Sequence, residues 1–277
     1  MDKLNFLTAG MPLLTGNKGY KEALDILEEL GLDGLELEFV HGVRIKDESK
    51  EIVKKSKLAK TIHAPFYINL NSKEPEKIDA SIERIIETAR VAKDIGASSI
   101  TYHAGFYLGQ PTEVVFDNIL KQTKIITDVL NDEKITVYIR PETTGKATQW
   151  GDLDEIINLS KGFEYVLPCV DFSHLHARYN GSFNTYDEFC TILDKIGTEL
   201  GERALYNFHG HAAGIAYSAK GEKHHLNFEE SDFNYKDLLR ALKAFDVKGT
   251  LVCESPNIET DCKLLKEYYL SLINECA

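Results

Sequence analysis

The sequence predicts an α/β protein folded as a (β/α)8 TIM barrel, with a single domain over residues 1–277. Short strand-like runs alternate eight times with longer stretches whose apolar residues recur at helical spacing. No Pro-, Gly- or Ser-rich linker divides the chain, and α/β barrels routinely reach this length as one domain. A doubly wound open sheet is the alternative. It is disfavoured because no Gly-rich phosphate turn follows the first strand.

The expected strands are rich in β-branched and aromatic residues, and they are apolar as in a sheet that is covered on both faces. In chain order they span residues 3–10, 34–40, 60–66, 98–105, 135–142, 165–174, 204–212 and 249–256. Helices are expected over about 20–30, 75–96, 113–131, 185–200, 235–245 and 259–275. The clearest of these carries an apolar stripe, with Pro75 near its start and Gly96 after it.

Composition limits the classes of function. Lys and Arg number 32 against 44 Asp and Glu, and the formal charge of −12 disfavours a broad grip on a polyanion. The five cysteines form no CxxC pair, which argues against a disulfide framework and against a thiolate zinc knuckle. The N-terminal segment lacks the apolar core of a signal peptide, and no run is long enough to span a membrane. We therefore expect a cytoplasmic protein that does not act in a membrane.

Ionisable residues follow six consecutive predicted strands, at the ends that a barrel gathers around one mouth. They are His63, His103, Glu142, Asp171 with His174, His209 with His211, and Glu254, joined by Glu222, His224 and His225 from the loop after the seventh strand. Burying so many ionisable groups around one mouth costs several kcal/mol each unless their charge is compensated. Divalent cations provide that compensation, so we expect a metal centre.

The side-chain types narrow the choice of metal. Imidazole mixed with carboxylate, and without cysteine, suits Zn²⁺, and Mn²⁺ and Fe²⁺ also fit. A catalytic zinc ion uses about three protein ligands, so about nine candidates predict two or three ions.

These segments resemble the endonuclease IV family, zinc-dependent apurinic/apyrimidinic endonucleases with a barrel fold. The resemblance spans essentially the whole chain and is strongest in "HAPFYINL" from residue 63, "PETTGKATQWG" from residue 141 and the pair Asp171-x-x-His174. It implies that His63 and His103 hold one zinc and share Glu142 with a second, that Asp171, His209 and Glu254 complete the second, and that His174, Glu222 and His224 hold the third.

Several positions depart from the family pattern. The family usually has Asp-x-His where this chain has Glu222 and His224, and His225 is an alternative ligand to His224, as His211 is to His209. Phe66 stands where a tyrosine is usual. The stretch "LELEFVHGVRIKDESK" lacks the basic and aromatic residues with which the family probes DNA after the second strand.

The resemblance implies a monomeric hydrolase that cleaves the DNA backbone at abasic sites in base excision repair. Glu142 and Glu254 are the expected catalytic carboxylates, with Tyr67, Lys146 and Arg178 as candidate substrate contacts. Two other functions remain open. A sugar isomerase or epimerase would need fewer ligands, with Glu142 and Glu254 on opposite sides of one metal, and a metal-binding barrel without catalysis is the third possibility.

Overall fold

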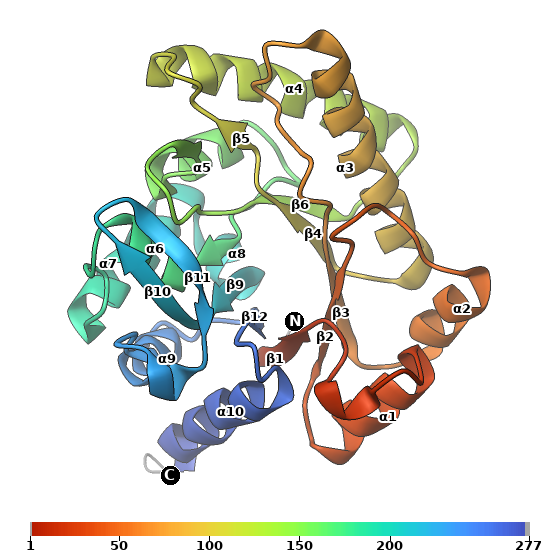
Figure 1. Ribbon diagram of the computed structural model, residues 1–277, viewed down its shortest axis with the longest axis vertical. Helices are drawn as coiled ribbons and strands as arrows, with labels where there is room; N and C mark the ends of the chain where they lie inside the picture. Colours follow the sequence, from red (N-terminus) through yellow and green to blue (C-terminus); the bar gives the residue numbers. More distant parts are fainter. Residues whose placement is uncertain (1, 275–277) are drawn as a thin grey trace.

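A closed barrel of parallel strands forms the centre of the computed structural model, which describes residues 2–274 (Figure 1). The barrel strands are β1 Leu4–Ala9, β2 Gly34–Glu38, β3 Ala59–His63, β4 Ser99–Tyr102, β6 Tyr138–Pro141, β8 Val170–Asp171, β9 Phe208–Ala212 and β12 Gly249–Cys253. They make one sheet in the order β6-β4-β3-β2-β1-β12-β9-β8. Parallel bridges Ile139–Val166 and Glu142–Cys169 join its two edges. The predicted (β/α)8 barrel is thus confirmed.

Helices surround the barrel and cover the outer face of its strands (Figure 1). Their bounds are α1 Tyr20–Glu29, α2 Asp47–Lys55, α3 Pro75–Ile95, α4 Thr112–Asp132, α5 Leu153–Ser160, α6 Phe172–Arg178, α7 Tyr186–Leu200, α8 Glu202–Tyr206, α9 Tyr235–Ala244 and α10 Glu259–Asn274, with 3-10 turns at Leu13–Thr15 and Phe228–Glu230. Across residues 2–274, none of these helices combines the length and apolarity that crossing a membrane requires. The six helices expected from apolar periodicity are all present; residue 275, the end of the last one, lies outside the described residues.

The hydrophobic core lies between the strands and the helices. Leu35, Leu37 and Ile62 are fully buried in it, each contributing about 1.5–3 kcal/mol by leaving water. Because strand side chains alternate between faces, their neighbours Glu36 and Thr61 point into the barrel, where the two side chains share a 2.7 Å hydrogen bond. The barrel interior is therefore polar, in contrast to the expectation of strands that are apolar on both faces.

The sixth barrel strand is much shorter than the expected segment 165–174. Only Val170–Asp171 is strand, and α6 begins at once. The Asp171 side chain accepts a 2.7 Å hydrogen bond from the His174 backbone N–H and so caps the helix. His174 thus lies on the first turn of a helix, one turn beyond the strand end that carries Asp171.

Two small antiparallel pairs lie beyond the barrel. One joins β5 Gly105–Phe106 to β7 Gln149–Trp150, and the other is the hairpin of β10 Gly214–Ser218 and β11 Gly221–Leu226. The hairpin packs against α6 (Figure 1). It therefore brings residues that follow the seventh barrel strand next to His174.

Candidate metal centre

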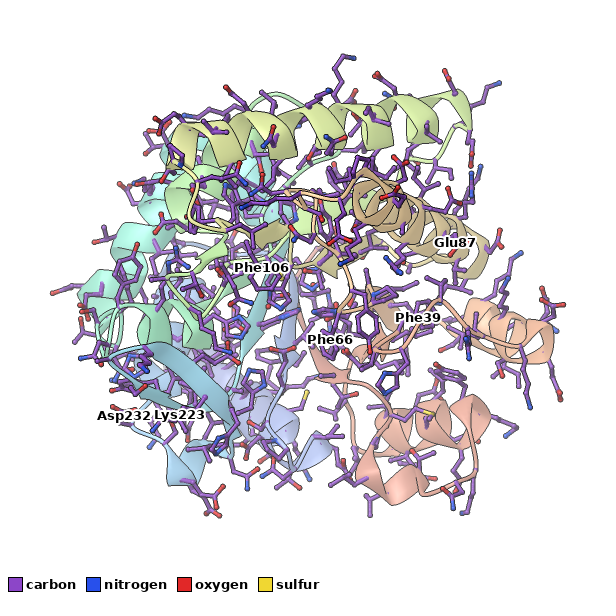
Figure 2. All side chains as sticks on the ribbon, turned by 45° about the horizontal axis from the view of Figure 1, so that its top comes forward. Phe39, Phe66, Glu87, Phe106, Lys223 and Asp232 are labelled. Carbon is purple, nitrogen blue, oxygen red and sulfur yellow. The ribbon has the colours of Figure 1, made fainter. Side chains whose placement is uncertain are left out.

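The expected ligands meet at the C-terminal ends of the barrel strands. His63 is the last residue of β3, and His103, Glu142 and Glu254 come one residue after β4, β6 and β12. In Figure 2, Phe66 and Phe106 lie toward the middle of the view, between the hairpin that carries Lys223 and the helix that carries Glu87. Within residues 2–274, three groups of potential ligand atoms adjoin at this end of the barrel and are described in turn below, and a fourth lies deeper.

The first group contains His63, His103 and Glu142, whose ligand atoms all lie within 4.8 Å of one another. Glu142 Oε2 is 3.2 Å from His63 Nε2 and 3.7 Å from His103 Nε2. His63 Nδ1 is 2.8 Å from the Ala64 carbonyl oxygen. A carbonyl only accepts, so Nδ1 carries the proton and Nε2 presents its lone pair to the centre when the ring is neutral.

The second group contains Glu142, Asp171, His211 and Glu254. His211 Nδ1 lies 3.5 Å from Glu142 Oε1 and 3.4 Å from Glu254 Oε1. The sequence assigned this position to His209, with His211 as the alternative, and the structure places His211 there. His209 lies two residues lower on the same face of β9, where its Nδ1 is 2.9 Å from Ser99 Oγ.

The third group contains Asp171, His174 and His225. His174 Nδ1 is 3.0 Å from the Thr143 carbonyl oxygen, which leaves Nε2 for a cation, and Glu222 Oε2 is 3.6 Å from that nitrogen. His224, the residue assigned by the resemblance, is exposed and belongs to none of the groups found within residues 2–274.

A bulge in β11 explains why His225, and not His224, belongs to this group of potential ligands. Ile215 and Tyr217 lie on one face of β10, and their partners across the hairpin are His225 and Glu222. Lys223 is the extra residue at the register shift, while His224 pairs with Ala216 on the opposite face. Glu222 and His225 therefore share a face although they are three positions apart.

The donor set fits divalent cations. Glu142 Oε1, Asp171 Oδ2, Glu254 Oε2 and His211 Nδ1 are buried, and none of them makes a hydrogen bond within the described part of the chain. Burial without a partner is costly for each atom, and a cation would satisfy all four together.

The electrostatics of the metal-free site agree with this assignment. Burial lowers the pKa of His63, but its hydrogen bond to Glu142 and the charge of Glu38 outweigh burial and raise that pKa to about 10. Burial raises the pKa of Asp171 to about 7, with help from Glu254 and Glu142. Without cations, protons would therefore supply much of the positive charge that this cluster of carboxylates needs.

The three expected substrate contacts differ in their surroundings. Tyr67 is 63% exposed beside Phe66, whose ring is 5.8 Å from that of His63. Lys146 is half-buried. Arg178 donates to the carbonyl oxygens of Lys146 at 2.6 Å and Gln149 at 3.0 Å, and its side chain is only 7% exposed. The guanidinium of Arg178 thus holds the loop after β6 in place, instead of facing a phosphate as expected.

Two glutamates near the centre, the buried Glu36 and the half-buried Glu38, were missed as site residues from the sequence. Glu36 lies 3.0 Å from both His209 Nε2 and His211 Nε2. Burial and the negative charges of Glu36 and Glu254 raise the pKa of Glu38 to about 8, against the effect of His63. The alternation of apolar and acidic residues in "GLELE" was the sequence signal that could have identified these two glutamates. It places both carboxylates inside the barrel, on the strand that the sequence predicted over residues 34–40.

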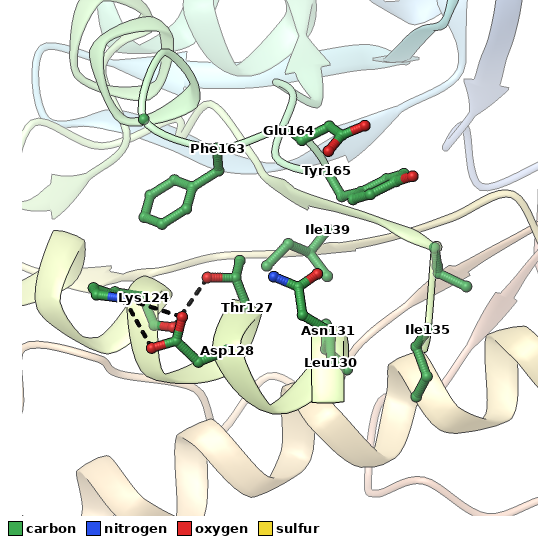
Figure 3. A pocket seen from close by; sticks show the side chains of 12 residues that line it. Lys124, Thr127, Asp128, Leu130, Asn131, Ile135, Ile139, Phe163, Glu164 and Tyr165 are labelled. Atoms are coloured by element: carbon green, nitrogen blue, oxygen red, sulfur yellow. Dashed lines mark hydrogen bonds and ion pairs between the residues drawn. The ribbon is translucent and has the colours of Figure 1, made fainter. Parts of the chain in front are cut away.

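A separate cavity lies away from the ligand groups. It has a volume of about 350 Å³ and lies between α4 and the chain around β6 and Phe163 (Figure 3). Lys124 and Asp128 form an ion pair at 2.9 Å along its wall, and no residue of the three ligand groups lines it. The chemistry of the side chains, and not cavity size, identifies the candidate metal centre.

Comparisons with known sequences agree with this geometry. The profile of the family described as xylose isomerase-like TIM barrel matches residues 24–268. An uncharacterized protein of Methanocaldococcus jannaschii is 44% identical over 272 residues, which cover 97% of this chain and 98% of that protein. A protein named probable endonuclease 4 from Mycoplasma pneumoniae is 26% identical over 219 residues, covering 76% of this chain and 74% of its own, and confirms the resemblance seen in the sequence.

Solved structures share the architecture. A D-tagatose 3-epimerase-like protein superposes with a TM-score of 0.73 at 18% identity, covering 97% of this chain and 99% of its own. Endonuclease IV from Thermus thermophilus superposes with a TM-score of 0.71 at 16% identity and the same coverage. At such identities the likeness concerns the fold alone. The family profile, in contrast, spans most of the chain and includes every residue of the three ligand groups, so this chain belongs to the xylose isomerase-like TIM barrel family.

Proposed function

We propose that this protein is a metal-dependent phosphodiesterase that hydrolyses the DNA backbone at abasic sites. The observation that carries the proposal is the sharing of carboxylates between neighbouring ligand groups. Glu142 belongs to the first and second groups, and Asp171 to the second and third. A carboxylate shared in this way is suited to bridge two cations. Two or three Zn²⁺ ions held so closely would supply a nucleophile at neutral pH and stabilise the attacking and leaving oxygens of a phosphodiester.

The residues of the chain have distinct parts in this activity. Glu142, 1% exposed, is fixed by contacts to histidines on both sides, so its two oxygens stay aimed at different groups. Glu254, with 13% of its side chain exposed, stands nearer the mouth and is suited to orient the reacting water. Phe66, 59% exposed beside His63, and Tyr67, 63% exposed next along the chain, offer apolar surface to an abasic sugar.

A sugar isomerase or epimerase is the second candidate, favoured by the composition of the second group. Glu142, Asp171, His211 and Glu254 would by themselves suffice for one cation between two glutamates. The likeness in fold to a D-tagatose 3-epimerase-like protein is compatible with that activity. The first and third groups distinguish the two candidates, because an isomerase with one metal has no use for them.

The test is nicking of an oligonucleotide duplex with one abasic site by zinc-loaded protein, with metal content measured on the same sample. Glu142→Gln and Glu254→Gln should each lower the nicking rate by at least about 10–100-fold, the loss that even substitutions around a metal ligand typically cause. Glu229→Gln, at an exposed glutamate outside the centre, should leave the rate unchanged. Absence of nicking by protein that is fully loaded with zinc, together with turnover of a ketose, would replace this proposal with the isomerase.

A further inference from the structure

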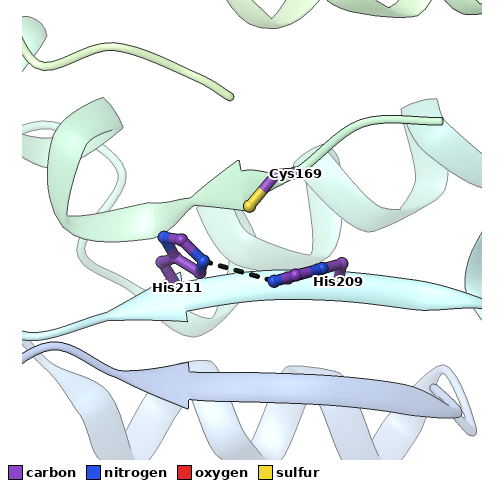
Figure 4. A group of neighbouring side chains, drawn as sticks. All are labelled: Cys169, His209 and His211. Atoms are coloured by element: carbon purple, nitrogen blue, oxygen red, sulfur yellow. Dashed lines mark hydrogen bonds between the residues drawn. The ribbon is translucent and has the colours of Figure 1, made fainter. Parts of the chain in front are cut away.

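A second cluster of potential ligands lies deeper in the barrel, beneath the centre described above. Cys169, from the segment before β8, stands beside His209 and His211 of β9, and the ligand atoms of these three residues lie within 4.8 Å of one another (Figure 4). Glu36 of β2 approaches the same point from across the barrel. All four residues are 0% exposed.

The distances within this cluster are those of a small coordination site. His209 Nε2 and His211 Nε2 are 3.2 Å apart, and each is 3.0 Å from an oxygen of Glu36. Zinc–nitrogen and zinc–oxygen bonds of about 2.0–2.2 Å place the ligands of a tetrahedral site about 3.3–3.6 Å from one another. The two histidine nitrogens and Glu36 therefore need only a few tenths of an ångström of expansion to accept an ion, and the Cys169 sulfur lies within 4.8 Å of both histidines.

Hydrogen bonding leaves part of the cluster unexplained. Glu36 Oε2 accepts a 2.7 Å hydrogen bond from the Thr61 hydroxyl, whereas Oε1 lies 3.0 Å from His211 Nε2. The two Nε2 atoms face each other, so at most one of them can carry a proton in that contact. An ion between these atoms would bind Glu36 and both imidazole nitrogens, so that neither Nε2 atom needs a proton.

We propose that Glu36, Cys169, His209 and His211 form a closed structural zinc site at the floor of the barrel. Four protein ligands leave no open position, which is typical of a structural and not a catalytic zinc. On binding, the Cys169 thiol and His211 Nε2 release their protons to solvent. The His211 ring then joins this ion through Nε2 to the centre above through Nδ1. The ion would tie β2 to β9, two strands that are not neighbours in the sheet. This site does not depend on the proposed cleavage of DNA.

Cobalt provides a direct test, because a thiolate bound to Co²⁺ gives a strong near-ultraviolet absorption that nitrogen and oxygen ligands do not give. The three ligand groups at the mouth contain no cysteine. Titration of the metal-free full-length protein with Co²⁺ should therefore produce this absorption only through the floor site. Cys169→Ser should abolish the absorption and lower the cobalt content by about one equivalent, and the matched variant Cys190→Ser, on α7, should keep both.

His209→Asn is a second variant that retains the thiol but removes another ligand, and it should also lose one equivalent of cobalt. Circular dichroism checks that each variant is folded, and the wild-type spectrum decides the matter even if one variant is not. Wild-type protein that binds cobalt without the thiolate absorption would overturn the proposal, as would an absorption that persists in Cys169→Ser. If the protein does not nick abasic DNA, we still expect the same cobalt spectrum, because the floor site does not depend on that activity.

Discussion

At the scale of single residues, two adjacent histidines of β11 occupy very different environments. His225 faces His174, with ring centroids 5.6 Å apart, and joins the third ligand group, whereas His224 is exposed on the opposite face of the hairpin. As free side chains the two imidazoles have the same affinity for metals, so only the direction in which each points from β11 distinguishes them.

This difference leads to a prediction with a built-in control. His225→Asn should lower the bound zinc by about one equivalent per chain, because the third group then loses one of its three ligands. His224→Asn should leave the zinc content unchanged. Elemental analysis of both variants after gel filtration measures the effect. The opposite result, with zinc lost only from His224→Asn, would show that β11 pairs without its bulge.

His209 and His211 show why the sequence could not assign every ligand. Residues two apart on a strand share a face, so alternation predicts that both rings enter the barrel and does not say which one reaches the mouth. The depth of each ring in the barrel depends on the stagger between neighbouring strands. His211 pairs with Val252 and His209 with Thr250, so His211 is the closer of the two to Glu254 at the end of β12. That register comes from the closed barrel and not from any local pattern.

At the scale of elements, the β10–β11 hairpin sets the geometry of the third group. Deleting His224 would remove the extra residue, because Lys223 would then pair with Ala216 while His225 keeps Ile215 as its partner. Glu222 and His225 would become two positions apart in a regular strand and would still share a face.

We therefore expect the variant that lacks His224 to retain its full zinc content, despite losing a histidine next to the site. Combining the deletion with His225→Asn should lower the content by about one equivalent, which shows that the retained ion depends on His225. Zinc loss in the simple deletion, with the circular dichroism spectrum unchanged, would mean that the bulge itself is required to aim these side chains.

The elements also show how far periodicity reaches as a predictor. The long helices α3 and α4 bury continuous apolar stripes and were predicted to within one residue at each end. Helix α2 buries only Val53, so its apolar pattern is too weak to detect. Helix α6 follows β8 without a turn and starts at the Asp171 cap, where the sequence reads as a continuing strand.

At the scale of the whole molecule, cations bound at the candidate centre would make stability depend on pH. In the metal-free protein burial lowers the pKa of His63, but its hydrogen bond to Glu142 and the charge of Glu38 outweigh burial and raise that pKa to about 10. His63 is therefore protonated at neutral pH and must lose a proton to bind a cation. For each proton that the metal displaces, the metal affinity rises about tenfold, or about 1.4 kcal/mol, for each unit by which the pH rises. This holds as long as the pH is below the pKa of the group.

EDTA should accordingly lower the melting temperature, and the gap between zinc-loaded and EDTA-treated protein should widen as the pH rises from 6 to 8. Asp171, whose pKa is raised to about 7 by burial and the neighbouring carboxylates, adds to the same trend over the lower part of this range. Differential scanning calorimetry at a fixed excess of free zinc measures the gap. A gap that narrows with rising pH would contradict the assignment of these groups as ligands.

The charge of the whole molecule determines how it would hold DNA. The formal charge is −12, and three dications would bring it only to about −6, with the positive potential concentrated at the mouth. Arg178 is committed to backbone carbonyls, and half-buried Lys146 is the remaining cation among the three expected substrate contacts. Outside the metal centre, Lys146 is therefore the one of these three contacts that could neutralise a phosphate.

We accordingly expect weak binding to undamaged duplex and a preference for a duplex with an abasic site. With two or three phosphates neutralised, the logarithm of the affinity should fall with the logarithm of salt concentration at a slope of about −2 to −3. Fluorescence anisotropy on matched intact and abasic duplexes, over a series of KCl concentrations, measures both quantities. A slope of about −6 or steeper on intact DNA would require an extended basic surface, and the mouth could not then be the main determinant of binding.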